Sequence, residues 1–540
     1  MNRFTRLISV ALSAVMLISL VACGSPNTNT GGTTPSANDA EEIVAFEGQE
    51  TPTQSSKDSL IMGYTREPDT IAPGGDSKTN AQMVVAILHD TIVGKDPSDQ
   101  SAIVPSISDT WDFSEDGTEI TFHIRDDIKF HDGTALTVED VLFSLDYATK
   151  QGLNSSGASI LKNWEDIGDN KIKVTLAYPY KPILQILATP GFSIISKATY
   201  EKSQAEGKNF GMMENGTGPY KLVSWTTGDR MVLEANNGWH RGAPAIKKVE
   251  IRLLSDETSG GLMIENGEID FFIGMNSADR PRFLANDSLE VINAPSAGTY
   301  IVTMNLKEGP FADNLALREA VAYAINRQDM LDGGMNGVGE VTPGPITPGY
   351  FGFVEGFEPY PYDPEMAKAK LAEAGYPNGI DVSFKTASDS WYSNPAQIVV
   401  EQLRQVGIRC KLEIMERAPY LKEVQEDMNY EMCYYMTWGD FPDADPVMWG
   451  KFHSETIGKQ MQNFAGVDNP EVDALLLKAR TSIDDNERKA LYAQLAEMNK
   501  ENVWYLMILT TYNSMVINKD LKGVEPIPAG YYNPAFYYWQ

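Results

Sequence analysis

The stretch WDFSEDGTEITFHIRDDIKFHDGTALTVEDVLFS, residues 111–144, determines how we interpret the rest of the chain. Its apolar residues Ile120, Phe122 and Ile124 alternate with polar ones. This period of two predicts a strand that buries one face. The Asp132-Gly133 pair that follows predicts a tight turn, because both residues tolerate the left-handed backbone that such turns need.

A helix is expected directly after this turn. Thr137 and Asp140 are three residues apart, the spacing of a capping box, in which each side chain binds the backbone N–H of the other residue. Apolar residues at helical spacing follow from Val141 onward. The stretch therefore predicts a strand, a turn and a capped helix that begins near Val138.

The order of these pieces resembles the signature of the family 5 extracellular solute-binding proteins, the peptide- and nickel-type receptors of ABC importers. The resemblance implies an α/β chain with a type II periplasmic-binding-protein fold: two lobes around a cleft, with an extra domain in the first lobe. It also implies a receptor that is not an enzyme, needs no cofactor, and hands a small-molecule or peptide ligand to ABC transporter permease and ATPase subunits. We expect it to act as a monomer.

The N-terminal residues indicate export. Arg3 and Arg6 precede the apolar run Leu7–Leu20, which has the two regions of a secretory signal and is too short for a full membrane span. The run ends in Leu20-Val21-Ala22-Cys23, which looks like a lipobox, so Cys23 is expected to carry a lipid and to become the mature N-terminus. We therefore expect the protein at the cell membrane, lipid-anchored, and facing outside or the periplasm.

The remaining segments follow from composition and from the family resemblance. After Cys23 the chain is rich in Gly, Ser, Thr, Asn and Pro and lacks apolar periodicity, which is typical of a flexible tether. The expected segments are 1–22 (signal peptide), 23–57 (tether), 58–98 (lobe I), 99–213 (extra domain of lobe I), 214–300 (lobe I again), 301–510 (lobe II) and 511–540 (return to lobe I).

Several helices have clear start and stop signals. Asp or Asn before Pro is common where helices begin, and Gly is common where they end. In the second half of the chain these helices alternate with strands, which predicts an α/β lobe. The expected elements are helices over 79–93, after a cap at Asp313, from Asp363-Pro364 to Gly375, from Asn394-Pro395 to Gly407, and from Asn469-Pro470 and Asp484-Asp485, with strands over 381–385, 408–414 and 505–516.

Composition and motifs exclude several classes of protein. The formal net charge of −30 repels polyphosphate, so we do not expect nucleic acid as a partner. The sequence contains no GxSxG, HExxH or Walker A motif, and its histidines are scattered, so neither catalysis nor a metal site is expected. Cys410 and Cys433 lack metal or redox spacing; we expect buried thiols, with a bridge between neighbouring strands as the alternative.

The ligand is expected in the cleft between the lobes. In the peptide-binding relatives that this chain resembles, an aspartate of a Trp-x-x-Asp stretch pairs with the ligand's α-amino group. Asp440 matches that aspartate, and Trp438, two rather than three positions earlier, would cover the ammonium. Asp443 and Asp445, in the same loop, are expected to be turn residues or helix caps.

A second candidate stretch is Ser388–Ser393. Its Trp391 and Tyr392 are expected either to stack on the ligand or to pack in the core. Dipeptide-binding relatives place an arginine near here for the ligand's carboxylate, and this stretch has none, which favours longer peptides over dipeptides. Arg66 and Glu67, after the first strand, are further ligand-binding candidates, with a plain surface loop as the alternative.

Other functions fit the same resemblance. The solute could be an oligosaccharide, a cationic metabolite or a nickel complex in place of a peptide. The fold could also serve a signalling or adhesion lipoprotein without transport, because a fold does not fix a function.

A charged bond from Asp440 to a peptide amine gives the first prediction. Asp440→Ala is expected to weaken the binding of peptides with a free amine by about 1.5–3 kcal/mol, the range for hydrogen bonds to charged groups. Calorimetric titration with one peptide and its N-acetylated form measures this loss. Unchanged affinity of the variant for the free-amine peptide would contradict the role of Asp440.

Overall fold

The computed structural model describes residues 51–540 apart from Thr53, Ser77, 151–154, 213–214, 439–440, 460–461 and 528–529. The chain divides into Met1–Ala45 and Phe46–Gln540, and the description concerns the second unit. The expected signal peptide, Cys23 and most of the tether lie outside the described residues. None of the helices in the described part combines the length and the apolar character needed to cross a membrane.

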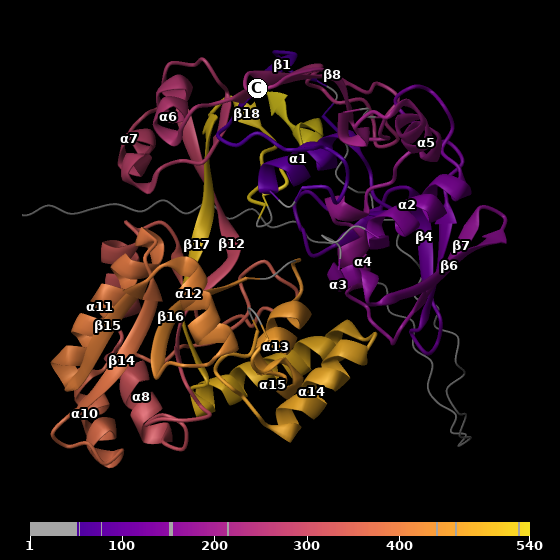
Figure 1. Cartoon of the computed structure of the whole chain (residues 1–540). Coiled ribbons are helices and arrows are strands. Elements are labelled where there is room, and N and C mark those ends of the chain that lie inside the picture. Colours follow the sequence, from indigo (N-terminus) through magenta and orange to yellow (C-terminus); the bar gives the residue numbers. More distant parts are fainter. Residues whose placement is uncertain are drawn as a thin grey trace, which may run out of the picture. The chain divides into compact units, whose positions relative to one another are not determined.

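An eleven-stranded sheet extends through the described chain, and two long strands, β12 (Leu289–Met304) and β17 (Tyr505–Asn518), pair near its middle (Figure 1). On one side follow the strands of the first lobe: β11 (Phe271–Ile273), β1 (Ser59–Tyr64), β10 (Lys248–Leu253), β9 (Arg230–Ala235) and β8 (Tyr220–Thr226). On the other side follow β16 (Met432–Trp438), β14 (Ile380–Ala387) and β15 (Ile408–Met415) of the second lobe, while the short β13 (Glu340–Val341) also pairs with β17.

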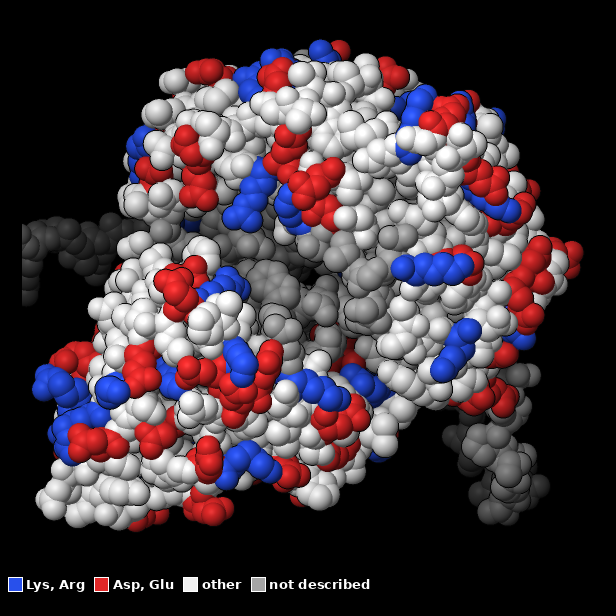
Figure 2. Space-filling view, viewed as in Figure 1, with Lys and Arg blue, Asp and Glu red and all other residues white. Residues whose placement is uncertain are grey.

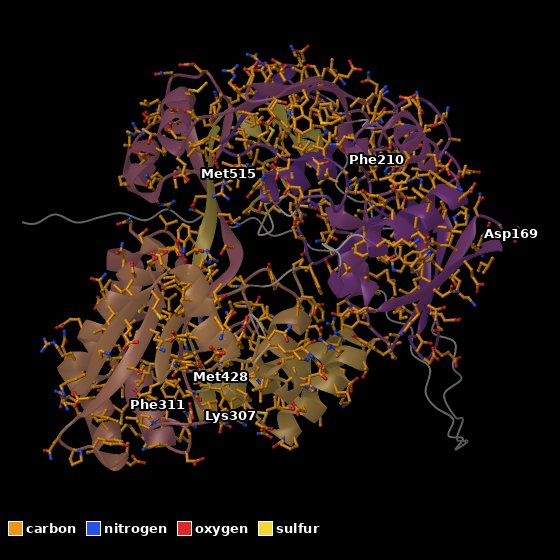
Figure 3. All side chains as sticks on the ribbon, in the orientation of Figure 1. Asp169, Phe210, Lys307, Phe311, Met428 and Met515 are labelled. Carbon is orange, nitrogen blue, oxygen red and sulfur yellow. The ribbon has the colours of Figure 1, made fainter. Side chains whose placement is uncertain are left out.

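Each lobe buries its own apolar core. The first-lobe core includes Met515 of β17, and the second-lobe core includes Phe311; both residues are labelled in Figure 3. The first-lobe helices are α1 (Thr79–Leu88), α6 (Glu257–Glu265) and α7 (Arg280–Leu284). The second-lobe helices are α8 (Leu315–Ala324), α9 (Arg327–Asp329), α10 (Pro364–Glu373), α11 (Ser390–Val406), α12 (Arg417–Leu421), α13 (Ala444–Phe452), α14 (Pro470–Thr481) and α15 (Asp485–Asn502).

The stretch that opened the sequence analysis lies in a separate four-stranded antiparallel sheet. Its strands, in spatial order, are β4 (Ser108–Phe113), β5 (Glu119–Ile124), β7 (Lys171–Leu176) and β6 (Leu161–Gly168). Helices α2 (Val138–Lys150), α3 (Ser155–Ala158), α4 (Ile183–Leu187) and α5 (Lys197–Glu206) accompany it, and the short pairs β2 (Val93–Lys95) with β3 (Ile103–Pro105) and β18 (Leu521–Lys522) with β19 (Tyr538–Trp539) complete the fold.

The expected strand, turn and helix are confirmed. Ile120, Phe122 and Ile124 are buried in one core. The backbone N–H of Asp140 donates to Thr137 Oγ1 at 3.2 Å, and the N–H of Thr137 donates to an Asp140 carboxylate oxygen at 3.0 Å. This is the reciprocal geometry of a capping box, and α2 begins at Val138 as predicted.

Three helix boundaries differ from the prediction. Helix α1 ends at Leu88 rather than near residue 93, because the N–H of Gly218 binds the Leu88 carbonyl and the chain continues extended from His89. Helix α8 is capped by Asn314 and not by the expected Asp313. The side-chain amide oxygen of Asn314 accepts the N–H of Leu317 at 3.1 Å, so the capping residue lies one position later than predicted.

Helix α11 begins at Ser390, five residues before the expected Pro395 start, so Pro395 lies inside it. A proline in a helix costs one backbone hydrogen bond. Burial of the Tyr392 ring, which is 1% exposed, stabilises the added turn. The other punctuated helices, α10, α14 and α15, begin where predicted.

The two cysteines of the described part are free thiols, so the alternative of a bridge is wrong. They belong to strands β15 and β16, on either side of β14. Burial raises the pKa of the Cys410 thiol to about 12 and raises that of Cys433 further. The face shown in Figure 2 carries acidic and basic side chains side by side rather than one continuous acidic patch.

The capping box predicts a measurable loss of stability. Thr137→Ala removes the oxygen that accepts the Asp140 N–H and is expected to lower the free energy of unfolding by about 0.5–2 kcal/mol. Thermal unfolding of the full chain measures the effect, with Lys162→Ala, an exposed residue of β6, as the control. Equal melting temperatures for the two variants would contradict a stabilising cap.

Candidate functional site

The parallel strands of both lobes end beside the place where β12 and β17 cross between the lobes. Strands β14 and β15 run parallel with β16, and the last residue of β16, Trp438, pairs with Gly298 at the crossing. In the first lobe β1, β10 and β11 are parallel. Strand β11 runs toward the crossing: its first residue, Phe271, pairs with Ile517, and its last, Ile273, pairs with Met515, which lies nearer the crossing. Ligands of open α/β sheets bind at such carboxyl edges, so we place the candidate site here.

The crossing itself is irregular. Pairing between β12 and β17 shifts register between Pro295 and Thr299, which leaves the intervening residues of β12 opposite Thr511 alone. Pro295 has no N–H to donate, and the hydroxyl of Ser296 bonds the Thr511 hydroxyl at 2.9 Å instead. Extra residues of this kind bend a strand and increase its twist, so regular pairing between the two crossing strands is interrupted at this level.

Buried threonine hydroxyls surround the irregular crossing. The hydroxyl of Thr510 lies 3.3 Å from that of Thr299 and 2.5 Å from that of Thr342. Thr299 also lies 3.4 Å from the Thr347 hydroxyl, and Thr437 Oγ1 donates to the Thr299 carbonyl. Each of these threonine hydroxyls has a hydrogen-bond partner, so none of them is buried at the crossing without one.

Three loops leave the second-lobe edge, and each carries a charged residue next to its strand. Asp389 follows β14, Arg417 follows β15, and Gly439-Asp440 follows β16. Asp440 lies outside the described residues, as does the side chain of Trp438, whose backbone ends β16. The roles given to Asp440 and Trp438 therefore stay predictions.

Trp391 and Tyr392 do not act as a pair, because successive residues of a helix point about 100° apart. The Trp391 side chain is 48% exposed, whereas Tyr392 is buried. The Tyr392 ring stacks on Tyr435 with centroids 6.0 Å apart and meets Tyr300 edge-on at 5.9 Å. Tyr392 thus packs in the core, and Trp391 is free to cover a ligand.

Arg417 is a candidate that sequence reasoning missed. Its guanidinium carbon lies 5.9 Å from the centroid of the Tyr392 ring, and the residue is exposed, with no ion pair to any described residue. Burial raises the pKa of Tyr300 and of Tyr392, and the Arg417 charge opposes this rise for both phenols. The sequence position of Arg417 could have indicated it: Arg417 lies two residues after the end of β15, just as Asp440 lies two residues after the end of β16.

An unpaired carboxylate oxygen lies at the same edge. Asp389 Oδ2 is buried without a hydrogen-bond partner among the described residues. The Asp389 charge acts on the Tyr392 phenol and raises its pKa, against the effect of Arg417. The edge therefore presents a cation, an anion and aromatic rings within one small region, a combination that suits a zwitterionic solute.

On the first-lobe edge, Arg66 and Glu67 follow β1 as expected. The Glu67 carboxylate accepts the indole N–H of Trp225 at 2.8 Å and the backbone N–H of Gly228, so it fastens the β8–β9 turn. Arg66 is exposed, and its carbonyl accepts the Asn80 side chain at 3.0 Å. Their ligand-binding roles stay predictions, and Arg66 is the less engaged of the two side chains.

Contacts with the extra domain and with helices α14 and α15 fix the residues that follow Asp440. Phe441 is buried in the extra-domain core, and Tyr180 Oη donates to Asp445 Oδ2 at 2.8 Å. Arg480 donates to both oxygens of the Asp445 carboxylate, at 3.0 and 2.8 Å. Asp443 caps α13 and accepts Arg488 Nη2 at 2.7 Å, which confirms the capping role expected in this loop.

The described residues on either side of 439–440 are fixed, because Trp438 ends β16 and Phe441 is buried in the extra-domain core. In the part of the chain that the structure describes, no group of three or more His, Cys, Asp or Glu side chains is arranged to hold a metal ion.

Two lobes joined at an irregular crossing, with charged and aromatic groups at the carboxyl edges, define a solute-binding protein of the type II periplasmic-binding-protein fold. Residues 102–459 match the model of the bacterial extracellular solute-binding proteins, family 5, and the chain belongs to this family of ABC-importer receptors.

Known proteins agree with this assignment. The glutathione-binding protein GsiB of Escherichia coli K12 is 28% identical over 469 residues, 85% of this chain and 90% of GsiB. The structure of HbpA2 from Haemophilus parasuis has a TM-score of 0.84 at 23% identity and covers 89% of this chain and 100% of HbpA2. DppA from Helicobacter pylori, in complex with the peptide STSA, has a TM-score of 0.69 at 23% identity, covering 89% of this chain and 98% of DppA.

The hydrogen bond from Tyr180 to Asp445 is expected to stabilise residues 441–445. Tyr180→Phe removes a hydrogen bond to a charged group, worth about 1.5–3 kcal/mol, and is expected to speed amide hydrogen exchange over residues 441–445. Tyr178→Phe is the matched control, since the Tyr178 ring packs edge-on against Tyr180 and its hydroxyl has no hydrogen bond among the described residues. Identical exchange in the two variants would show that the bond does not hold the loop.

Proposed function

We propose that this protein is a lipid-anchored receptor that captures oligopeptides and delivers them to the permease of an ABC importer. The observation that carries the proposal is the second-lobe carboxyl edge, where exposed Arg417 follows β15 and lies beside Tyr392, while Asp440 follows β16, on the other side of β14. A free peptide has an ammonium at one end and a carboxylate at the other, and these are the groups that an aspartate and an arginine bind best.

In this proposal the two ends of the peptide have different partners. Asp440 binds the α-amino group, and Arg417 binds the C-terminal carboxylate with its planar guanidinium. The exposed Trp391 indole covers apolar peptide side chains. Arg417 supplies the arginine that the Ser388–Ser393 stretch lacks, so short peptides are included among the proposed ligands.

Capture requires closure of the two lobes around the ligand. A ligand shifts the balance between open and closed forms only by its difference in affinity for them. The irregular crossing at Pro295–Thr299 is the place where β12 can bend without breaking regular pairing on either side. The receptor uses no ATP and performs no chemistry on the peptide.

Relatives and sequence support the proposal. GsiB is described as glutathione-binding, and DppA was solved with a peptide bound. The lipobox at Cys23 supports attachment to the outer face of the cell membrane, with the tether between the lipid and the lobes.

A ligand screen tests the proposed function. A ligand that binds only the folded state raises the melting temperature, so thermal shifts of the purified protein with di- to hexapeptides, simple sugars and Ni²⁺ separate the candidate solutes. We expect shifts with peptides, reduced when either peptide end is blocked. A shift with sugars or Ni²⁺ alone would overturn the peptide assignment.

Arg417 provides a sharper prediction. Arg417→Gln is expected to weaken binding of a free-carboxylate peptide by about tenfold to a hundredfold and to leave its C-amidated form unaffected. Arg409→Gln is the control, because Arg409 lies at the opposite end of β15 and pairs with Asp381. Retention by Arg417→Gln of the preference for the free carboxylate would rule out the Arg417 contact.

A further inference from the structure

The first lobe contains a cavity of about 120 Å³, which lies between the first-lobe core and the core of the extra domain. Its wall comes from the end of α1, from β2 and the loop after it, from residues 239–241, and from the C-terminal tail. None of its lining residues belongs to the loops at the carboxyl edges. A space of this size holds several waters or one small organic molecule.

Two cations line this cavity without forming an ion pair to any described residue. The Lys95 ammonium makes no hydrogen bond or ion pair there, and it is half-buried. The Arg241 guanidinium lies over the Phe536 ring at 4.9 Å and over Trp239 at 5.6 Å, but forms no salt bridge. Burial lowers the pKa of Lys95 to about 8, with no opposing charge nearby. Burial also lowers the pKa of Arg241, and the charges of Asp90 and Asp96 offset that effect only in part.

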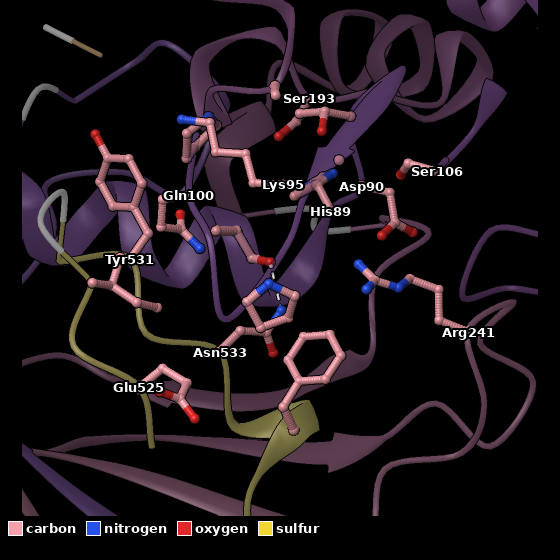
Figure 4. Close-up of a pocket in the computed structure, with 18 of the residues that line it drawn as sticks. His89, Asp90, Lys95, Gln100, Ser106, Ser193, Arg241, Glu525, Tyr531 and Asn533 are labelled. Atoms are coloured by element: carbon pink, nitrogen blue, oxygen red, sulfur yellow. Dashed lines mark hydrogen bonds between the residues drawn. The ribbon is translucent and has the colours of Figure 1, made fainter. Parts of the chain in front are cut away.

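The acids that line the cavity form no ion pair with Lys95 or Arg241 among the described residues, although the Asp90 charge acts on Arg241. Both carboxylate oxygens of Asp90 accept the Trp239 indole N–H at 3.2 Å, and His240 Nε2 lies 3.4 Å from Asp90 Oδ2. Glu525 lies on the tail side of the cavity, away from both cations, and the Lys95 and Arg241 charges lie on different sides (Figure 4). A hydroxyl without a partner, Ser193 Oγ, is buried in the same wall.

From this arrangement we infer that the cavity is a second binding site, for a small organic anion with negative groups at its two ends, such as an α,ω-dicarboxylate. One carboxylate pairs with Lys95, the other with Arg241, and Ser193 donates a hydrogen bond. The driving force is the relief of the desolvated Lys95 charge and of an Arg241 charge that Asp90 and Asp96 compensate only in part. The site is separate from the peptide site and does not depend on it.

A dicarboxylate series tests the inference. Thermal shift and calorimetry on the full chain, with succinate through suberate as probes, are expected to give saturable binding for at least one length. Lys95→Met and Arg241→Met should each weaken that binding tenfold or more, whereas Lys162→Met, which alters an exposed lysine, should not. No binding by any member of the series, or equal affinity in the Lys95→Met variant, would overturn the site.

Lys95→Met is expected to fold, because it removes a half-buried charge that has no partner, and its melting temperature without ligand should not fall. Both Met variants should also keep their peptide affinity, which separates failure of this site from failure of the peptide site.

The pH dependence provides a second readout. Dicarboxylate affinity should fall as the pH is raised through about 8, where Lys95 loses its proton, and this fall should disappear in Lys95→Met. The other titratable groups that line the cavity are His89, Asp90, Arg241, Glu525, Tyr531 and Tyr537. The same fall in wild type and variant would assign the titration to one of those groups and count against Lys95 as the anion's partner.

Discussion

The pairing of β12 with β17 is the constraint on which the rest of the structure depends. Each of these strands contributes one end to the first lobe and the other end to the second, so one ladder of hydrogen bonds connects two hydrophobic cores. Strand β16 runs antiparallel to β12, and β11 runs antiparallel to β17. The parallel strands of both lobes must therefore finish at the crossing. The location of the candidate site follows from strand order alone, before any side chain is considered.

The chemistry at that location comes from residues just beyond the strand ends. Such residues leave a rigid sheet and are free to face a solute, whereas residues within the strands are committed to the cores. The segment around Asp440 joins two parts of the molecule: it leaves β16 of the second lobe, and Phe441 is buried in the core of the extra domain. The extra domain therefore buries the residue that directly follows Asp440, the residue proposed to bind the ligand.

Local signals in the sequence predicted local structure well. The β5 strand and the Thr137–Asp140 cap involve residues a few positions apart, and nothing distant alters them. The start of α11 was misjudged because burial of Tyr392 by Tyr300 and Tyr435 outweighs the penalty of an internal proline, and those tyrosines lie far away in the sequence. Arg417 was overlooked for a similar reason: its place beside Tyr392 depends on β15 lying next to β14.

The reduced state of the two described thiols has a consequence for where such a protein can work. A thiol reacts with oxidants through its thiolate, and burial keeps Cys410 and Cys433 almost entirely protonated at neutral pH. Among the described residues the lobes are therefore held together by packing, by backbone pairing and by the crossing strands themselves, without a disulfide. An exported chain built in this way can mature without an oxidative folding system, and its shape should be indifferent to whether the surroundings are aerated or anoxic.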